Sequence, residues 1–188
     1  MRITLFVLAG ALINVWGEVA AQAFPSKPIR IVVAYAAGGP NDLMARAVGQ
    51  KLTEIVRQQV VVDNRPGAGS NIGSDHVAKS APDGYTLLLG SPANAINRTL
   101  YSRMPYDPLK DLAPVTLLAT NPYLFVVHPS LPARSVKEFI TLAKSKTGQI
   151  TFASSGAGGA SHLTGELFKL QTKVDILHVP YKGGAPAL

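Results

Sequence analysis

The sequence predicts an α/β fold with parallel strands. Apolar runs of strand length alternate with helical patterns, and two of these runs lead directly into glycine-rich turns that open a helix. Hydrophobic residues make up 47% of the 188 positions, which is enough for a sizeable core and excludes a disordered chain. The length suits one domain, or one lobe and part of another.

In the first half, residues 29–35 form a near-continuous apolar run, as expected for a buried parallel strand. The helical pattern that follows has apolar residues near one face at Met44, Val48, Leu52 and Ile55. Further strands are expected at 59–62 and 85–89, on either side of a short helical stretch at 72–79. Glycine, proline and aspartate turns separate these elements.

The pattern resets after residue 119, and strands are expected at 123–127, 150–154 and 176–179. Ser135 and Glu138 have the spacing of a capping box, in which each side chain satisfies a backbone N–H of the helix start. Two apolar helix stripes follow, Val136, Phe139, Ile140 and Ala143 in one helix and Leu163, Leu167 and Leu170 in the next.

The first 23 residues are predicted to be a secretory signal peptide. Arg2 is followed by an apolar stretch from residue 3 to 15, which is too short to span a bilayer comfortably. Ala21-Gln22-Ala23 is a small-x-small cleavage pattern, so export and cleavage after Ala23 are expected. The alternative is an uncleaved helix that is amphipathic or anchors the chain to a membrane.

The net charge of +7 comes from scattered lysines and arginines, with no basic run and no interleaved aromatic residues. This distribution argues against a nucleic-acid groove. It fits a soluble receptor for anions, but it also fits an ordinary charged surface. The chain has no cysteine, which excludes disulfides and thiolate metal sites.

No pattern indicates an enzyme, a metal or a cofactor. There is no nucleophile elbow and no phosphate-binding loop, and the glycines at 67, 69 and 73 depart from the dinucleotide spacing. None of the four histidines has metal-ligand spacing. His162 is expected to pack or cap in the first turn of its helix.

The two glycine-rich turns, at 36–42 and 154–161, carry the main functional signal. Each follows a strand and opens a helix, whose N-terminus has unpaired amides and a partial positive charge. Glycine lets such a backbone approach a ligand closely. Each turn is therefore a potential anion site without any arginine. Either turn, taken alone, could also be only a tight connection.

A set of motifs in a fixed order carries a resemblance to one family. The quoted stretches are 24–30 (FPSKPIR), 38–42 (GGPND), 64–69 (NRPGAG), 71–73 (NIG), 81–88 (APDGYTLL), 154–156 (SSG), 161–163 (SHL) and 178–184 (HVPYKGG). Together they resemble the Bug-type receptors of tripartite tricarboxylate transporters over essentially all of residues 24–188.

The resemblance implies a type II periplasmic binding protein-like fold, with two α/β lobes and a ligand cleft between them. The first lobe would span residues 24–120, and residues 121–188 would begin a second, incomplete lobe. Family members continue well past the last motif, so the chain is expected to be a fragment or a truncated receptor. Proline, frequent in the family at positions 34 and 37, is replaced here by Ala34 and Ala37.

The resemblance also implies ligand-binding residues by position. One wall of the cleft would be lined by Tyr35, Gly38, Gly39 and Asp42, the other by Ser155, Gly156, Ala160 and Ser161, and the rim by Ser91, Asn94 and Tyr181. Asp42 is expected to cap its helix, to bind water or to meet a ligand ammonium group. Its spacing to Arg46 also suits an i,i+4 ion pair.

The expected function is capture of a small organic carboxylate in the periplasm for the membrane subunits of such a transporter. The ligand would be a di- or tricarboxylate, an acidic amino acid or a related amide, and the receptor would be monomeric. A sensory receptor that presents its ligand to a signalling partner is the alternative. A nucleotide-binding enzyme is the more remote one.

Overall fold

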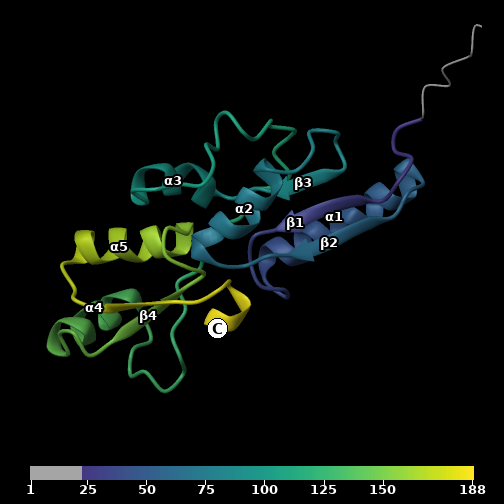
Figure 1. Cartoon of the computed structure of the whole chain (residues 1–188). Coiled ribbons are helices and arrows are strands. Elements are labelled where there is room, and N and C mark those ends of the chain that lie inside the picture. The colour runs from purple at the N-terminus through teal and green to yellow at the C-terminus, as the bar shows by residue number, and fades with distance from the viewer. Residues whose placement is uncertain (1–22) are drawn as a thin grey trace, which may run out of the picture.

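A computed structural model describes residues 23–188 (Figure 1). The predicted signal peptide, residues 1–23, lies outside this range except for its last residue. The described chain forms two α/β lobes, which are joined by residues 101–135, a long stretch without a helix or a strand. The predicted lobe boundary at residue 120 falls inside this stretch and stays a prediction.

The first lobe is built on a parallel sheet in the order β2-β1-β3. Its strands are β1 (Ile29–Val33), β2 (Val60–Asn64) and β3 (Thr86–Leu89). Its helices are α1 (Pro40–Val56), α2 (Asn71–Ala78) and α3 (Pro92–Leu100), with a short 3-10 turn, η1 (Ala68–Ser70). In the central strand, Ile31 lies opposite Val62 on one side and Leu87 on the other.

The second lobe has a two-stranded parallel sheet of β4 (Thr151–Ser154) and β5 (Leu177–Pro180). Its helices are α4 (Val136–Ser145) and α5 (Ala160–Thr172), with a short 3-10 turn, η2 (Ala185–Ala187), near the C-terminus. Each lobe has its own core. The first core contains Ile31, Val33, Tyr35, Ala45 and Leu89, and the second contains Ala133, Phe139, Ala143, Val174 and Ile176.

The helix start at Ser135 confirms half of the predicted capping box. The Ser135 hydroxyl accepts the Glu138 N–H at 3.2 Å. The Glu138 carboxylate accepts the N–H of Arg134 at 2.8 Å, where a capping box would use the N–H of Ser135. The carboxylate thus satisfies a donor one residue earlier in the chain.

The predicted strand at 123–127 is wrong. These residues lie in no strand, and Leu124 and Val126 are 81% and 66% exposed. Their composition favours a strand, but a strand needs a neighbour for its backbone hydrogen bonds. Within the described part of the chain, β4 and β5 pair only with each other.

Two further differences concern helices. The sequence patterns did not indicate α3, which occupies residues 92–100 directly after β3. The leucine stripe of α5 is helical as predicted, but Leu163, Leu167 and Leu170 are exposed, and so is Leu177 on the adjoining β5. Apolar surface of the second lobe is therefore left uncovered by residues 23–188.

The two lobes meet at the glycine turns. The Ala36 N–H donates to the Lys182 carbonyl at 2.9 Å, so the chain after β5 returns to the first lobe, as the yellow segment in Figure 1 shows. On the other side, the Tyr101 hydroxyl lies 3.5 Å from the Ala157 carbonyl. None of the helices between residues 23 and 188 is both long and apolar enough to cross a membrane.

Candidate functional site

The first glycine turn leaves the carboxyl end of β1 and opens α1. Gly38 has φ +82°, a left-handed conformation that favours glycine, and Gly39 is the N-cap. Pro40 occupies the first helical position, where its missing N–H costs nothing. The N–H groups of Asn41 and Asp42 lie in the first turn, where a helix leaves its amides without intrahelical partners.

Asp42 stabilises this turn from inside the protein. It is 2% exposed, and its Oδ2 accepts the Gly38 N–H at 2.9 Å and the Arg46 Nε–H at 3.0 Å. The hydrogen bond from Arg46 lowers the pKa of Asp42 to about 2 against an opposing effect of burial. The predicted ion pair with Arg46 is confirmed, and among the expected roles the contacts support that of a structural cap.

Replacing Asp42 with asparagine is expected to lower the free energy of unfolding by about 1–2 kcal/mol at pH 7, because two hydrogen bonds to a charge are weakened. The folded pKa lies below the unfolded value, so this stabilisation is complete above about pH 4 and is lost as pH falls through about 2. Urea unfolding measures the difference in the free energy of unfolding between the original protein and Asp42→Asn. This difference should be roughly half as large at about pH 3 as at pH 7.

Glu54→Gln is the matched control for Asp42→Asn, since it removes a carboxylate from the same helix. The pair of Glu54 with Lys51 is exposed on both sides and should contribute little at any pH. Equal losses in the two variants, or a loss at Asp42 that does not change with pH, would contradict the assigned role.

The second turn leaves the carboxyl end of β4 and opens α5 in the same way. Gly156 and Gly158 have φ +136° and +81°. The Ser155 N–H donates to the Ser161 hydroxyl at 3.0 Å, and the two hydroxyl oxygens are 2.9 Å apart. These bonds hold the start of α5 against the end of β4 and leave a pair of hydroxyls at the helix N-terminus.

A polar wall continues from the first turn along β3 and α3. The Tyr35 and Ser91 hydroxyls are 2.8 Å apart, and burial raises the pKa of Tyr35. Asn94 accepts the Ser91 N–H at 2.9 Å and donates to the Ser74 hydroxyl at 2.7 Å. Asn94 is therefore fixed by hydrogen bonds to the N-cap of its own helix and to α2, and it holds the start of α3.

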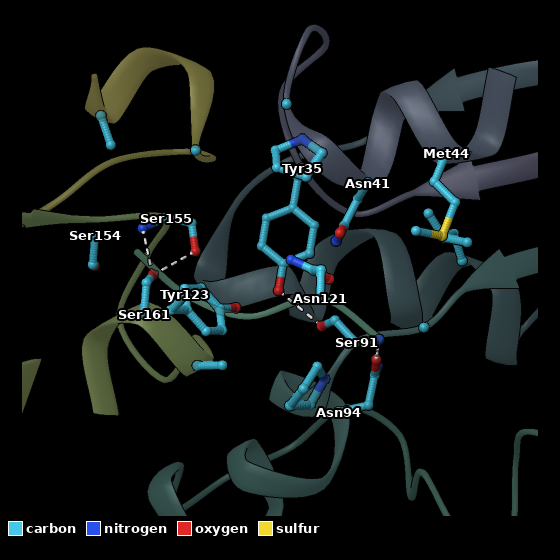
Figure 2. A pocket seen from close by; sticks show the side chains of 18 of the residues that line it. Tyr35, Asn41, Met44, Ser91, Asn94, Asn121, Tyr123, Ser154, Ser155 and Ser161 are labelled. Atoms are coloured by element: carbon cyan, nitrogen blue, oxygen red, sulfur yellow. Dashed lines mark hydrogen bonds between the residues drawn. The ribbon is translucent and has the colours of Figure 1, made fainter. Parts of the chain in front are cut away.

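The two turns and this wall face one large open cavity of about 2970 Å³. Eight of the eleven predicted site residues line it, namely Tyr35, Gly38, Gly39, Ser91, Asn94, Ser155, Ala160 and Ser161. Figure 2 shows side chains from both lobes around it. Its volume exceeds the roughly 300–1,000 Å³ of typical ligand pockets, so a small ligand would occupy only part of it.

The other three predicted residues lie elsewhere. Asp42 is buried beneath the first turn and does not line the cavity. Gly156 and Tyr181 line a smaller pocket of about 240 Å³ at the junction of the lobes, together with Tyr35 and Ser155. A direct ligand contact by any of the three stays a prediction.

Among the polar residues that line the cavity, the sequence interpretation did not name Asn41, Asn121 and Tyr123 as ligand contacts. Asn41 belongs to the first turn, and the other two come from the segment between the lobes (Figure 2). Burial, and then the nearby Tyr35 hydroxyl, raise the pKa of Tyr123. Asn121 and Tyr123 lie just after residue 119, where the sequence pattern resets.

The cavity has few cationic groups for an anion. Among its lining residues, only Lys146 and His128 can carry a positive charge. Residues 23–188 also contain no cluster of three or more histidine, aspartate or glutamate side chains placed to hold a metal. Within this part of the protein, an anion at the turns would depend on backbone N–H groups, hydroxyls and helix dipoles.

Comparison with known proteins agrees with this geometry. Residues 44–188 match the family described as "Tripartite tricarboxylate transporter family receptor". The chain belongs to this family. Protein BugT of Bordetella pertussis, a curated relative, is 40% identical over 180 residues, which are 95% of this chain and 55% of BugT. A protein from the tcbD-tcbE intergenic region of Pseudomonas sp. is 42% identical over 186 residues.

Solved structures of receptors in this group have the same fold. An R. palustris protein solved with adipate is 41% identical, with a TM-score of 0.85 over 87% of this chain and 55% of that chain. MatC from Rhodopseudomonas palustris, solved with bound malate, is 32% identical, with a TM-score of 0.79 over 87% of this chain and 56% of that chain. The periplasmic binding protein BugD is 34% identical, with a TM-score of 0.78.

These matches confirm the predicted Bug-type family and its two-lobed periplasmic binding fold. The family consists of periplasmic solute-binding receptors. This chain spans about half the length of the curated relatives it matches.

Proposed function

We propose that this chain contributes the carboxylate-binding turns of a periplasmic solute receptor. The ligand would be a small organic di- or tricarboxylate, an acidic amino acid or a related amide. The receptor would deliver it as a monomer to the membrane subunits of a tripartite tricarboxylate-type transporter. Export, with cleavage after Ala23, would place the mature chain in the periplasm.

The observation that carries the proposal is that the N-termini of two helices, α1 and α5, line the same cavity. Gly38 and Gly39 open α1, Ser155 and Ser161 lie at the start of α5, and these residues line the same cavity. Each hydrogen bond from such a group to a carboxylate contributes roughly 1.5–3 kcal/mol. Three or four such bonds could support micromolar binding once the costs of association are subtracted.

The likeness to proteins solved with adipate and with malate supports the ligand class, since both are dicarboxylates. A ligand held by turns from both lobes would favour their closed arrangement over an open one. Tyr35, Asn121 and Tyr123 would then discriminate between ligands, because their polar groups lie in the same cavity and need matching partners.

The test is ligand-induced stabilisation of residues 24–188. Adipate or malate at about one hundred times its Kd is expected to stabilise the fold by about 2.7 kcal/mol, which raises Tm by several degrees. Adipamide, which keeps the shape of adipate and lacks its charges, is the matched control and should give no shift. Stabilisation by NAD, with none by any carboxylate, would overturn the proposal in favour of a nucleotide site.

A further inference from the structure

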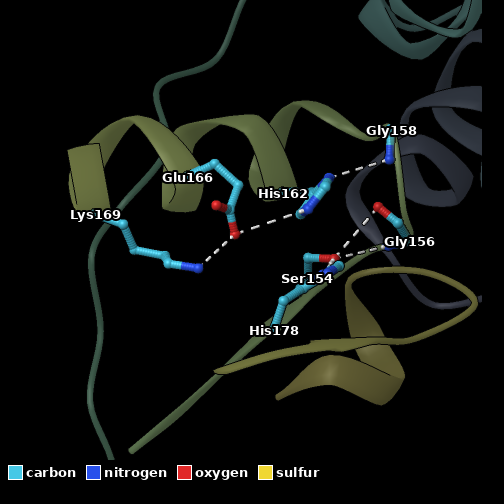
Figure 3. A network of polar contacts seen from close by, with 7 residues as sticks. All are labelled: Ser154, Gly156, Gly158, His162, Glu166, Lys169 and His178. Carbon is cyan, nitrogen blue, oxygen red and sulfur yellow. Dashed lines mark hydrogen bonds and ion pairs between the residues drawn. The ribbon is translucent and has the colours of Figure 1, made fainter. Parts of the chain in front are cut away.

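His162 on α5 and His178 on β5 form a stacked pair beside the second glycine turn (Figure 3). The centroids of the two rings are 4.0 Å apart, and their planes differ by 21°. The side chain of His162 is 17% exposed. Neither ring lines the large cavity, so the proposed function does not use them as ligand contacts.

His162 holds the turn through its own backbone contact. Its Nδ1 accepts the N–H of Gly158 at 3.2 Å. A ring nitrogen can accept only when it carries no proton, so this bond requires neutral His162 with its proton on Nε2. That nitrogen faces the Glu166 carboxylate at 4.0 Å, which favours the same tautomer.

His178 acts on the turn through Ser154. Its Nε2 lies 2.6 Å from the Ser154 hydroxyl, which is buried with 1% exposure. The same hydroxyl accepts the Gly156 N–H at 3.2 Å. The histidine pair therefore reaches two backbone N–H groups of one turn, at Gly156 and at Gly158.

Few charged groups face the pair. On α5 these are Glu166 and Lys169, which are themselves paired at 3.2 Å. On β4 the neighbours are Phe152, stacked on His178 at 4.9 Å, and Ser154, and neither titrates in the accessible range. Burial, and then the neighbouring His162 ring, lower the pKa of His178. Two positive charges on rings this close would repel each other.

We infer that His162 and His178 are positioning residues for ligand binding, which hold the second turn in shape through the N–H groups of Gly158 and, by way of Ser154, of Gly156 while His162 is neutral. The inference rests on the proposed function, since it assumes that this turn binds a carboxylate. A proton on Nδ1 of His162 would point at the Gly158 N–H and remove the bond. The turn should then loosen, and affinity should fall as pH falls.

Simple attraction predicts the opposite, because a protonated imidazole near an anion strengthens binding at low pH. His162→Asn and His162→Leu separate the two effects. Asparagine places an acceptor oxygen where Nδ1 stood and does not titrate, whereas leucine offers no acceptor. The positioning role predicts a rescue by asparagine that attraction does not.

The first measurement needs no ligand and no variant. In protein labelled with ¹⁵N-glycine, the Gly158 amide signal of residues 24–188 is followed by NMR between about pH 7.5 and 5.5, where imidazoles titrate. We expect it to move together with the His162 ring signals, and its protection from solvent exchange, relative to an unstructured amide at the same pH, to fall at the acidic end. If the Gly158 amide signal does not change together with the His162 ring signals, the inference is wrong.

The second measurement is the affinity for adipate over the same pH range. We expect the original protein to lose affinity by about three- to tenfold on acidification, since a proton on Nδ1 would remove the acceptor of the Gly158 N–H. His162→Asn should lose only the small part of its affinity that protonation of adipate itself removes, and His162→Leu should bind weakly at every pH. Stronger binding at low pH, or full affinity in His162→Leu, overturns the inference.

The two measurements fail independently. If no carboxylate binds while the Gly158 amide follows His162, the proposed function is wrong and the contact that positions the turn stands. If adipate binds and the amide does not follow His162, the proposed function stands and the positioning role is wrong.

Discussion

Alanine in place of Gly158 should lower the free energy of unfolding by about 2–4 kcal/mol. Alanine would have to adopt a left-handed backbone conformation, and its β-carbon would also be packed too closely against its neighbours. Gly158 has φ +81°. A β-carbon there would overlap the Asn97 side-chain oxygen and lie 2.9 Å from Leu100 Cδ2. Asn97 is fully buried and donates to the Gly69 carbonyl at 2.7 Å, so it cannot move aside without breaking that bond.

Because Asn97 and Leu100 belong to the first lobe, the same substitution should separate the lobes. Ligand-induced stabilisation should therefore fall together with stability. Gly148→Ala is the matched control, since its φ is +70° but the nearest atom to a β-carbon, Asp175 Oδ2, is 3.5 Å away. Urea unfolding should show that the free energy of unfolding falls by only about 1–2 kcal/mol in the control. Equal losses in the two variants would show that Gly158 is strained but not a contact between the lobes.

Several elements of this fold follow from local patterns. The apolar run at 29–35 became β1, which is buried between two parallel neighbours. The period at Met44, Val48 and Leu52 became α1. Both could be predicted from the order of apolar residues. A strand that is buried on both sides is a continuous apolar run, and a helix that is buried on one face repeats apolar residues every three to four positions.

The wrong strand at 123–127 shows the limit of such patterns. Its residues favour strand geometry, yet pairing depends on a second segment that a local window does not contain. Helix α3 was missed for a different reason. Ser91 and Pro92 are good first residues of a helix, and Asn94 caps the Ser91 N–H, but the stretch that follows has few apolar residues.

The candidate site was predictable where chemistry lies in a contiguous turn. The glycine turns at 36–42 and 154–161 were found from sequence, and the structure places residues of both on one cavity. Asn121 and Tyr123 were missed because only the packing of the two lobes brings the connecting segment there. The hydrogen bond between His178 and Ser154 joins positions 24 residues apart, and no local sequence spacing predicts it.

Leucine in place of Gly39 is expected to abolish most ligand binding while it leaves the fold in place. Gly39 has φ −83°, which any residue adopts, and a β-carbon would lie 3.7 Å from Ala185 N and from the Ala36 carbonyl oxygen, an ordinary contact distance. The free energy of unfolding should therefore change by less than about 1 kcal/mol. The remaining leucine atoms would occupy the space where α1 presents its first N–H groups.

Affinity for adipate or malate should fall at least about ten- to a hundredfold in Gly39→Leu, since displacing the carboxylate removes one or more charge-assisted hydrogen bonds. Gly39→Ala is the control, because its single added methyl group fits and most of the affinity should remain. Melting shifts measured with and without ligand report fold and binding in one experiment. An unchanged shift in the leucine variant would exclude the first turn as a wall of the site, because a ligand carboxylate and a leucine side chain cannot share the same space.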